Sequence, residues 1–484
     1  MAPTPTWRLR AAFARRLSAM YGTEVPAYTT LLEVTGQIND EVAGRDPDAG
    51  RLGSIDRVTA ERHGAIRVGT PTELRQAGQV FAALGMHPVG FYDLRDGDVG
   101  AVPVVSTAFR PLDATELDRN PFRVFTSLLT TGDRRFFDAD LESRLTAFLA
   151  RRRLFPPELL DLAARAEREH GLDEAAAERF LTLAVDAFTL STEPVDRAWY
   201  AELERISAVA ADIGGVTTTH VNHLTPRVLD IDALYRRMGE RGITMIDRIQ
   251  GPPRWAGPDV LLRQTSFRAL AEPRTFRDPD GRLSRGALRV RFGEVEARGI
   301  ALTRTGRARY DALTAETDRR TAGRPDAERQ ATARTLWERD FPRTEAQLHA
   351  ERLAFFTYRP VTDRPRDGRR PPADPTALLA DGWLTAHPLV YEDFLPRSAA
   401  GIFRSNLTGD GTRDPHRDGT PFDAHRLAEA LGRPVRDPFA GYAAQQDRSL
   451  RAALTALGAD EALRALPAPT PTAPTDARPT RSHR

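Results

Sequence analysis

Apolar and polar positions follow two periods along this chain, and together they predict alternating strands and helices. The stretch ERHGAIRVGTPTEL, residues 61–74, begins with strand-like alternation and continues into a helix that starts with a capping box. VNHLTPRVLDID, residues 221–232, has the same plan. In each case a glycine ends the helix, and HPVGFYDL or ITMIDRI is then predicted to be a strand. The pattern therefore predicts two strand-helix-strand modules.

The shared order of the two modules indicates a weak internal repeat. Each module has a histidine on its first strand, His63 or His223, before the turn and the capped helix. Two similar units of this kind suggest paired half-barrels, so we expect an α+β fold with a partly closed β-barrel. Coincidence competes with this interpretation, because strand-helix-strand units are common.

Helical periodicity outside the modules predicts the rest of the organisation. We expect one domain over residues 1–466 with core modules at about 54–133 and 213–312. A helical insertion is predicted at about 134–212, and a C-terminal part of helices and loops at about 313–466. The Pro/Thr-rich tail, residues 467–484, is predicted to be disordered.

Composition excludes several kinds of chemistry. The chain has no cysteine, which excludes disulfides and thiolate-bound metals. It also has no lysine, so all 69 basic residues are arginine, and Schiff-base catalysis is excluded. General acid–base catalysis would therefore have to use His, Asp, Glu or Tyr.

Charge and hydropathy argue against a nucleic-acid-binding surface and against a membrane span. The 69 basic residues nearly balance the 67 acidic ones, and the short arginine clusters are typical of solvated surface. No window reaches the roughly 18 apolar residues of a membrane span. The basic N-terminus lacks the apolar run of a secretory signal, so we expect an amphipathic first helix and a cytoplasmic protein.

Three side chains are predicted to converge on one metal ion. His63 and His223 occupy matching places in the two modules, and RVRFGEVEARG, residues 289–299, adds a carboxylate, Glu294, on a predicted strand. Two imidazoles and one carboxylate form the facial triad typical of non-haem Fe(II) oxygenases, which leaves positions for substrate and dioxygen. Ligand type alone does not choose among iron, manganese and zinc.

The alternation leaves two ligand positions open. His220 competes with His223, and the β-branched residues before His220 favour a strand that would point the two rings in opposite directions. Glu296 shares the predicted face of Glu294, so the pattern does not choose between them. Gly293 marks a bulge or a close approach there.

Arg67 is predicted to lie on the same strand face as His63, four residues further along. An inward-facing guanidinium needs an anion. One interpretation is a substrate carboxylate held bidentately, and the other is a buried pair with a structural Asp or Glu.

The chain resembles the 2-oxoadipate dioxygenase/decarboxylase family, whose core is like the vicinal oxygen chelate fold. The resemblance covers most of the sequence except the tail. Its motifs are ERHGAIRVGT, NPFRVFTSLL, NHLTPRVLDID, LLRQTSFRAL, FGEVEARGIALT and VYEDFLPRSAAGIF.

This resemblance implies Fe(II) held by His63, His223 and Glu294, with Arg67 on a substrate carboxylate. It also implies a pocket serine at Ser398. Arg397 stands where the family pattern suggests a small apolar residue, so substrate preference depends on where its side chain points.

The activity implied by the resemblance is conversion of 2-oxoadipate and O2 to 2-hydroxyglutarate and CO2, in lysine breakdown. Two alternatives remain open at this point. One is a zinc- or manganese-dependent lyase or hydrolase acting on a small carboxylic acid, and the other is a binding protein of the same fold without catalysis.

Overall fold

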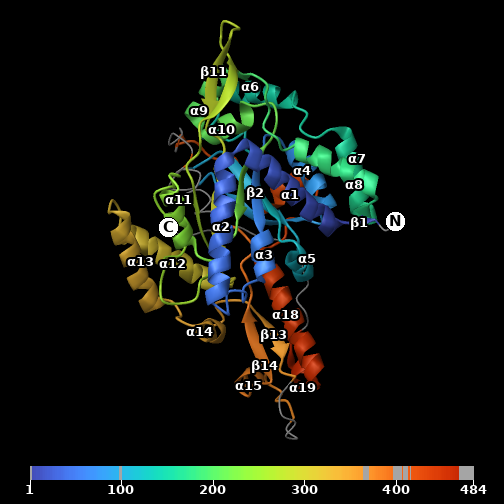
Figure 1. Ribbon diagram of the computed structural model, residues 1–484, viewed down its shortest axis with the longest axis vertical. Coiled ribbons are helices and arrows are strands. Elements are labelled where there is room, and N and C mark those ends of the chain that lie inside the picture. Colours follow the sequence, from blue (N-terminus) through green and yellow to red (C-terminus); the bar gives the residue numbers. More distant parts are fainter. Residues whose placement is uncertain are drawn as a thin grey trace.

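The computed structural model describes residues 3–96, 101–362, 370–395, 406, 413–414 and 416–467. Arg397 and Ser398, which the family resemblance places in the substrate pocket, lie outside the described residues. The molecule is elongated, and its central strands are surrounded by helices (Figure 1).

A five-stranded sheet in the order β3-β4-β5-β2-β8 forms the centre. Its strands are β2 (Arg62–Val68), β3 (His87–Asp93), β4 (Val104–Arg110), β5 (Arg123–Leu129) and β8 (Val221–Pro226). β2 runs parallel to β5 and antiparallel to β8, whereas β3, β4 and β5 form an antiparallel series. The two predicted modules therefore meet in one sheet, with β2 and β8 side by side.

Four smaller sheets accompany the central one in the described residues. They are β9 (Leu262–Ser266) with β12 (Glu294–Arg298); β11 (Leu283–Leu288), β10 (Glu272–Arg277) and β7 (Val195–Asp196); β13 (Phe356–Pro360) with β14 (Leu384–Pro388); and β1 (Thr4–Pro5) with β6 (Gly171–Leu172). None of the sheets in these ranges is closed. The fold is thus a mixture of helices and several open sheets, and the predicted partly closed barrel is not confirmed.

The first module follows its sequence pattern closely. The side chain of Thr70 accepts a hydrogen bond from the Glu73 amide, and the Glu73 carboxylate caps the Thr70 amide in return. Helix α4 (Pro71–Ala83) begins with proline at its first position, and Gly85 with φ of +69° ends it. HPVGFYDL then forms β3, as predicted.

The second module departs from its pattern after the helix. Asp230 caps α11 (Ile231–Glu240), and Gly242 with φ of +75° follows its end, as expected. The predicted strand ITMIDRI is wrong, because Met245 and Gln250 make only isolated bridges to Phe267 and Gln264. The segment lies along β9 without regular pairing.

Two other predicted strands are shorter than the sequence suggested. β8 starts at Val221, so the β-branched residues 217–220 precede the strand. β12 starts at Glu294, and residues 289–293 are not extended sheet.

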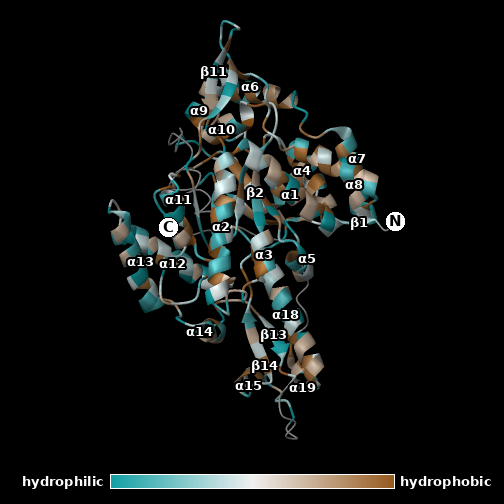
Figure 2. Ribbon diagram, viewed as in Figure 1, coloured by the Kyte–Doolittle hydropathy of each residue, from teal (hydrophilic) through white to brown (hydrophobic). Residues whose placement is uncertain are grey.

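The helices predicted near residues 5–45 and within 134–212 are confirmed. Besides α4 and α11, the helices of the first half are α1 (Thr6–Glu24), α2 (Pro26–Arg45), α3 (Ile55–Ala60), α5 (Ala114–Arg119), α6 (Ala139–Ala150), α7 (Pro157–Glu169), α8 (Glu174–Asp186), α9 (Arg197–Ile206) and α10 (Ala208–Gly214). The short helices α3 and α5 were not predicted. Hydrophilic and hydrophobic residues alternate along α2 (Figure 2), and its apolar face, including Leu31, Val34 and Ile38, is buried.

The described C-terminal part contains helices, loops and the β13–β14 pair. Its helices are α12 (Arg304–Arg320), α13 (Asp326–Asp340), α14 (Glu345–Ala350), α15 (Pro375–Ala380), α17 (Ala424–Leu431), α18 (Pro438–Leu457) and α19 (Asp460–Ala465). One large hydrophobic core extends from Leu9 to Val435, and a second gathers around Trp337. The division into modules and an insertion stays a prediction. No helix in the described ranges is long and apolar enough to cross a membrane.

Candidate metal centre

Three buried side chains from three different strands point at one another. His63 on β2, His223 on β8 and Glu294 on β12 each offer a ligand atom, and these atoms all lie within 4.8 Å of one another. Oε1 of Glu294 is 3.7 Å from Nε2 of His63, and Oε2 is 3.4 Å from Nε2 of His223. The three predicted ligands are therefore brought together.

The strand pairing explains how distant residues meet. Ala65, two residues after His63, lies opposite His223 across the antiparallel β2–β8 pair. Arg227, just after β8, forms a bridge with Glu296, which brings β12 against β8. One sheet thus supplies both imidazoles, and the neighbouring strand supplies the carboxylate.

Gly293 allows β12 to approach its neighbours closely. A Cβ atom at this position would lie 2.0 Å from Cε1 of Phe267. Phe267 in turn donates its backbone N–H to the Gly293 carbonyl at 3.0 Å. The close approach that the sequence predicted at Gly293 is therefore present, directly before Glu294.

The two residues that competed for ligand positions face other partners. Glu296 approaches the opposite side of His63, with Oε2 3.2 Å from Nδ1, and pairs with Arg298. His220 lies with Nε2 3.2 Å from Oδ1 of Asp212. Neither belongs to the converging set in the described residues.

The electrostatics of the triad favour a bound cation. Burial lowers the pKa of both His63 and His223, so both imidazoles stay neutral and keep a lone pair for a metal. Burial, together with Glu296, raises the pKa of Glu294 well above its ordinary value. A buried carboxylate between two neutral rings lacks a positive partner, and a metal ion would supply one.

The distances also fit a metal ion. Imidazole and carboxylate ligands bind zinc, for example, at about 2.0–2.2 Å, which puts neighbouring donor atoms about 3.4 Å apart on a tetrahedral ion and about 3 Å apart on an octahedral one. The observed 3.4 and 3.7 Å separations from Glu294 need only a small closure to reach that geometry. Nδ1 of His223 is buried without a hydrogen-bond partner, and the ring reaches the cluster through Nε2.

Aromatic rings enclose the two imidazoles. Phe394 contacts His63 edge-on, with ring centroids 4.8 Å apart, and Phe292 lies 5.1 Å from His223. Tyr21 fixes the neighbouring backbone, because its hydroxyl donates to the carbonyls of Asn222 and Phe292 at 3.0 and 2.8 Å. The centre is therefore buried and held from several sides.

Arg67 is buried and paired with an acid of helix α10. Its Nη1 donates to Oδ2 of Asp212, which also accepts from Asn222 at 2.8 Å. Burial alone would raise the pKa of Asp212, but His220 and Arg67 outweigh it and lower that pKa to about 2. Arg67 also lowers the pKa of His223, after burial and His63. One of the two interpretations of Arg67, a buried pair with a structural acid, is therefore present. Arg67 also acts electrostatically on the triad.

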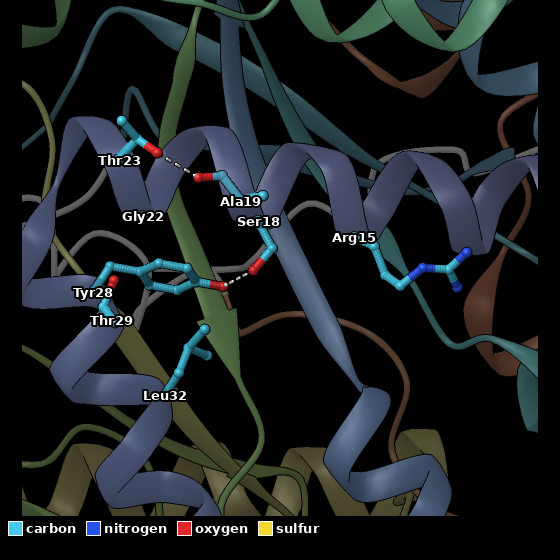
Figure 3. A pocket seen from close by; sticks show the side chains of 8 residues that line it. All are labelled: Arg15, Ser18, Ala19, Gly22, Thr23, Tyr28, Thr29 and Leu32. Carbon is cyan, nitrogen blue, oxygen red and sulfur yellow. Dashed lines mark hydrogen bonds between the residues drawn. The ribbon is translucent and has the colours of Figure 1, made fainter. Parts of the chain in front are cut away.

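A separate hollow is lined by residues of the N-terminal helices α1 and α2 (Figure 3). It has a volume of about 450 Å³, and α1 and α2 line it with Arg15, Ser18, Ala19, Gly22, Thr23, Tyr28, Thr29 and Leu32. The Tyr28 and Ser18 hydroxyls are 2.9 Å apart in its wall. Its lining has no histidine or carboxylate, so it offers none of the ligands of the metal centre.

Two residues of the site escaped prediction from sequence. Asp212 carried no local signal, because its partner Arg67 lies far away in the chain. Phe394 belongs to the motif VYEDFLPRSAAGIF, but nothing in the alternation indicated a contact with His63. Ser398 and Arg397 belong to the same motif and lie outside the described residues.

Comparisons with known proteins agree along nearly the whole chain. The sequence model of a family described as 2-oxoadipate dioxygenase/decarboxylase matches residues 13–406. A Mycobacterium tuberculosis protein of that name is 56% identical over 445 residues, which are 92% of this chain and 98% of the relative. A Pseudomonas putida protein of the same name is 41% identical over 461 residues, covering 93% of this chain and 97% of the relative.

A solved structure has the same fold. The crystal structure of a hydroxyglutarate synthase in complex with 2-oxoadipate from Pseudomonas putida superposes with a TM-score of 0.82 at 40% identity, covering 94% of this chain and 99% of that one. With relatives this similar over more than nine-tenths of its length, the chain belongs to the 2-oxoadipate dioxygenase/decarboxylase family.

Proposed function

We propose that this protein converts 2-oxoadipate and O2 into 2-hydroxyglutarate and CO2. The observation that carries the proposal is the buried convergence of His63, His223 and Glu294 close to the guanidinium of Arg67. Family membership and the 2-oxoadipate complex of a relative support the choice of substrate. The reaction balances, because loss of CO2 and hydroxylation of the shortened chain together consume both oxygen atoms of O2.

We propose Fe(II) as the metal, held by the three side chains. Two neutral imidazoles and one carboxylate leave open positions on an octahedral ion, as in other non-haem Fe(II) oxygenases. Bound there, Fe(II) would supply the sites for a 2-oxo acid and dioxygen and the electron transfer that links them. The neutral state of His63 and His223 and the carboxylate of Glu294 suit this ion.

The protein's own part is to hold and orient the substrate. Arg67 shares a strand face with His63, and we propose that its guanidinium binds a substrate carboxylate so that the reacting carbon faces the metal. Asp212 fixes the guanidinium from the other side. Phe394 and Phe292 exclude water around the imidazoles, which strengthens these charged contacts.

We further propose Ser398 as a hydrogen-bonding residue of the substrate pocket. This rests on its place in the PRSAAG segment of the family motif. Arg397, beside it, replaces the small apolar residue of the family pattern. If it faces the substrate, an additional cation would favour diacids more strongly.

The finer fold and cellular assignments are proposals of the same kind. We propose that the two modules form a vicinal oxygen chelate-like core, on the ground that β2 and β8 each supply one histidine at a matching place. The partners would be a small 2-oxo dicarboxylate and O2, with no nucleic acid or membrane, and the enzyme would act in the cytoplasm.

Anaerobic reconstitution tests the function. Metal-free protein is loaded with Fe(II) without oxygen and mixed with 2-oxoadipate, and O2 is then admitted. We expect equal amounts of CO2 and 2-hydroxyglutarate only after oxygen is added. Turnover with zinc in the absence of O2 would instead identify a lyase or hydrolase, and binding of 2-oxoadipate without any turnover would identify a binding protein.

A further inference from the structure

His63 presents its two ring nitrogens to two different glutamates of the same strand. Nε2 faces Oε1 of Glu294 at 3.7 Å, and Nδ1 faces Oε2 of Glu296 at 3.2 Å. Residues two apart on a strand point to the same side, so β12 places one carboxylate on each side of the ring. The imidazole is therefore held between the metal centre and a second acid.

Glu296 is itself fixed as an anion by arginine. Arg298 donates from Nε to Oε1 at 2.6 Å and from Nη2 to Oε2 at 3.0 Å, a bidentate pair. Arg123 adds its Nη1 at 3.6 Å. Glu296 is fully buried, so a side chain with these partners stays charged and accepts hydrogen bonds only.

We infer that Glu296 is a positioning residue that sets the tautomer and orientation of His63 for metal binding. A neutral imidazole carries its proton on one nitrogen only. An anionic carboxylate beside Nδ1 favours the proton there, which leaves the lone pair on Nε2 facing Glu294. This inference rests on the proposed metal centre and adds a residue that acts through His63 rather than on the metal.

The same arginine also secures the other contact on His63. Nη1 of Arg298 donates to the carbonyls of Tyr391 at 2.7 Å and Asp393 at 3.1 Å. These carbonyls come just before Phe394, whose ring lies edge-on to His63. Arg298 thus links the carboxylate at Nδ1 to the aromatic wall, so that one rigid unit holds the ring.

The competing explanation is that Glu296 only balances charge in the buried arginine network. Glu61 offers a matched control within that network. It is equally buried and pairs with Arg123 at 2.6 Å, Arg227 at 3.1 Å and Arg298 at 3.2 Å, and its interactions with described residues include no histidine. A role in charge balance alone predicts similar effects for Glu61 and Glu296, whereas positioning predicts different ones.

The test measures metal binding rather than turnover. Co(II) is titrated into metal-free wild type, Glu296→Gln, Glu296→Leu and Glu61→Gln, and its visible absorption reports affinity and geometry. Residues that hydrogen-bond to a metal-ligating histidine typically contribute 10–100-fold to the affinity for the metal. We expect a loss in that range for Glu296→Leu, a smaller loss for Glu296→Gln, whose amide oxygen still accepts a hydrogen bond, and near wild-type affinity for Glu61→Gln.

The tautomer is read directly from 15N NMR of histidine in the Zn(II)-loaded proteins. We expect His63 protonated on Nδ1 in wild type and Glu296→Gln, and a loss of that preference in Glu296→Leu. If Glu296→Leu does not fold, the positioning role is tested by comparing Glu296→Gln with Glu61→Gln in Co(II) affinity and in the tautomer of His63. Equal losses in the two Gln variants, or unchanged affinity in a folded Glu296→Leu, would overturn the inference. If the wild type binds no Co(II), the metal centre itself is wrong, which is a separate result.

Discussion

Arg67 donates a hydrogen bond to the carboxylate of Asp212, a residue of helix α10, and both side chains are buried. The pair holds the guanidinium that we propose for the substrate. We expect Arg67→Ala to keep its metal and lose about 100-fold in kcat/KM for 2-oxoadipate, because a hydrogen bond to a charged group contributes about 1.5–3 kcal/mol. Steady-state kinetics together with metal analysis check this. Unchanged kinetics would show that Arg67 serves only the structural pair.

The acid of this pair predicts a dependence of stability on pH. The pKa of Asp212 is about 2 in the folded protein and 3.8 ordinarily. The pair's contribution to the free energy of unfolding is therefore fully present above about pH 4. It is lost as pH falls toward 2, and the shift corresponds to about 2 kcal/mol. Urea unfolding of wild type and Asp212→Asn should therefore give free energies that converge as pH falls from 6 to 3. A constant difference would contradict the low pKa.

The two histidines of the second module should differ sharply when replaced. His223 points at Glu294, whereas His220 points at Asp212. We expect His223→Ala to lose more than the 10–100-fold in Co(II) affinity that is typical of outer-shell residues, and His220→Ala to lose far less. Titration with visible absorption measures both. The reverse ranking would make His220 the ligand.

The close approach at Gly293 predicts a defect without any change of ligand. A methyl group there would meet the ring of Phe267, so Gly293→Ala should push Glu294 out of line and cost about 1–3 kcal/mol of unfolding free energy. Gly239 on α11 has open space around it and is a matched control. Gly239→Ala should leave Co(II) affinity unchanged. Similar affinity in the two variants would mean that the backbone at 293 adapts.

Sequence reasoning worked best where the signal was local. The capping box of α4, the Asp230 cap of α11 and the glycines after both helices depend on neighbours within a few residues, and both helices were predicted correctly. ITMIDRI failed because apolar residues can be buried beside a strand without pairing with it. Met245 and Ile246 are both buried next to β9, but the segment makes only isolated contacts with that strand.

The site shows a similar limit. A period of two put Glu294 and Glu296 on one face, and only the position of His63 between them separates their roles. Asp212 could not be found from sequence, because its contact with Arg67 depends on how α10 packs against β2. Contacts between residues far apart in the chain depend on the tertiary structure, which local sequence patterns do not specify.

The wide spacing of the three converging residues has a consequence for biosynthesis. His63, His223 and Glu294 belong to strands that are far apart in the chain, and β12 ends only at Arg298. A nascent chain on the ribosome therefore has an incomplete centre until well over half of it has been made. The metal ion should therefore be captured only after β12 has been made, and a product truncated before Glu294 should remain empty.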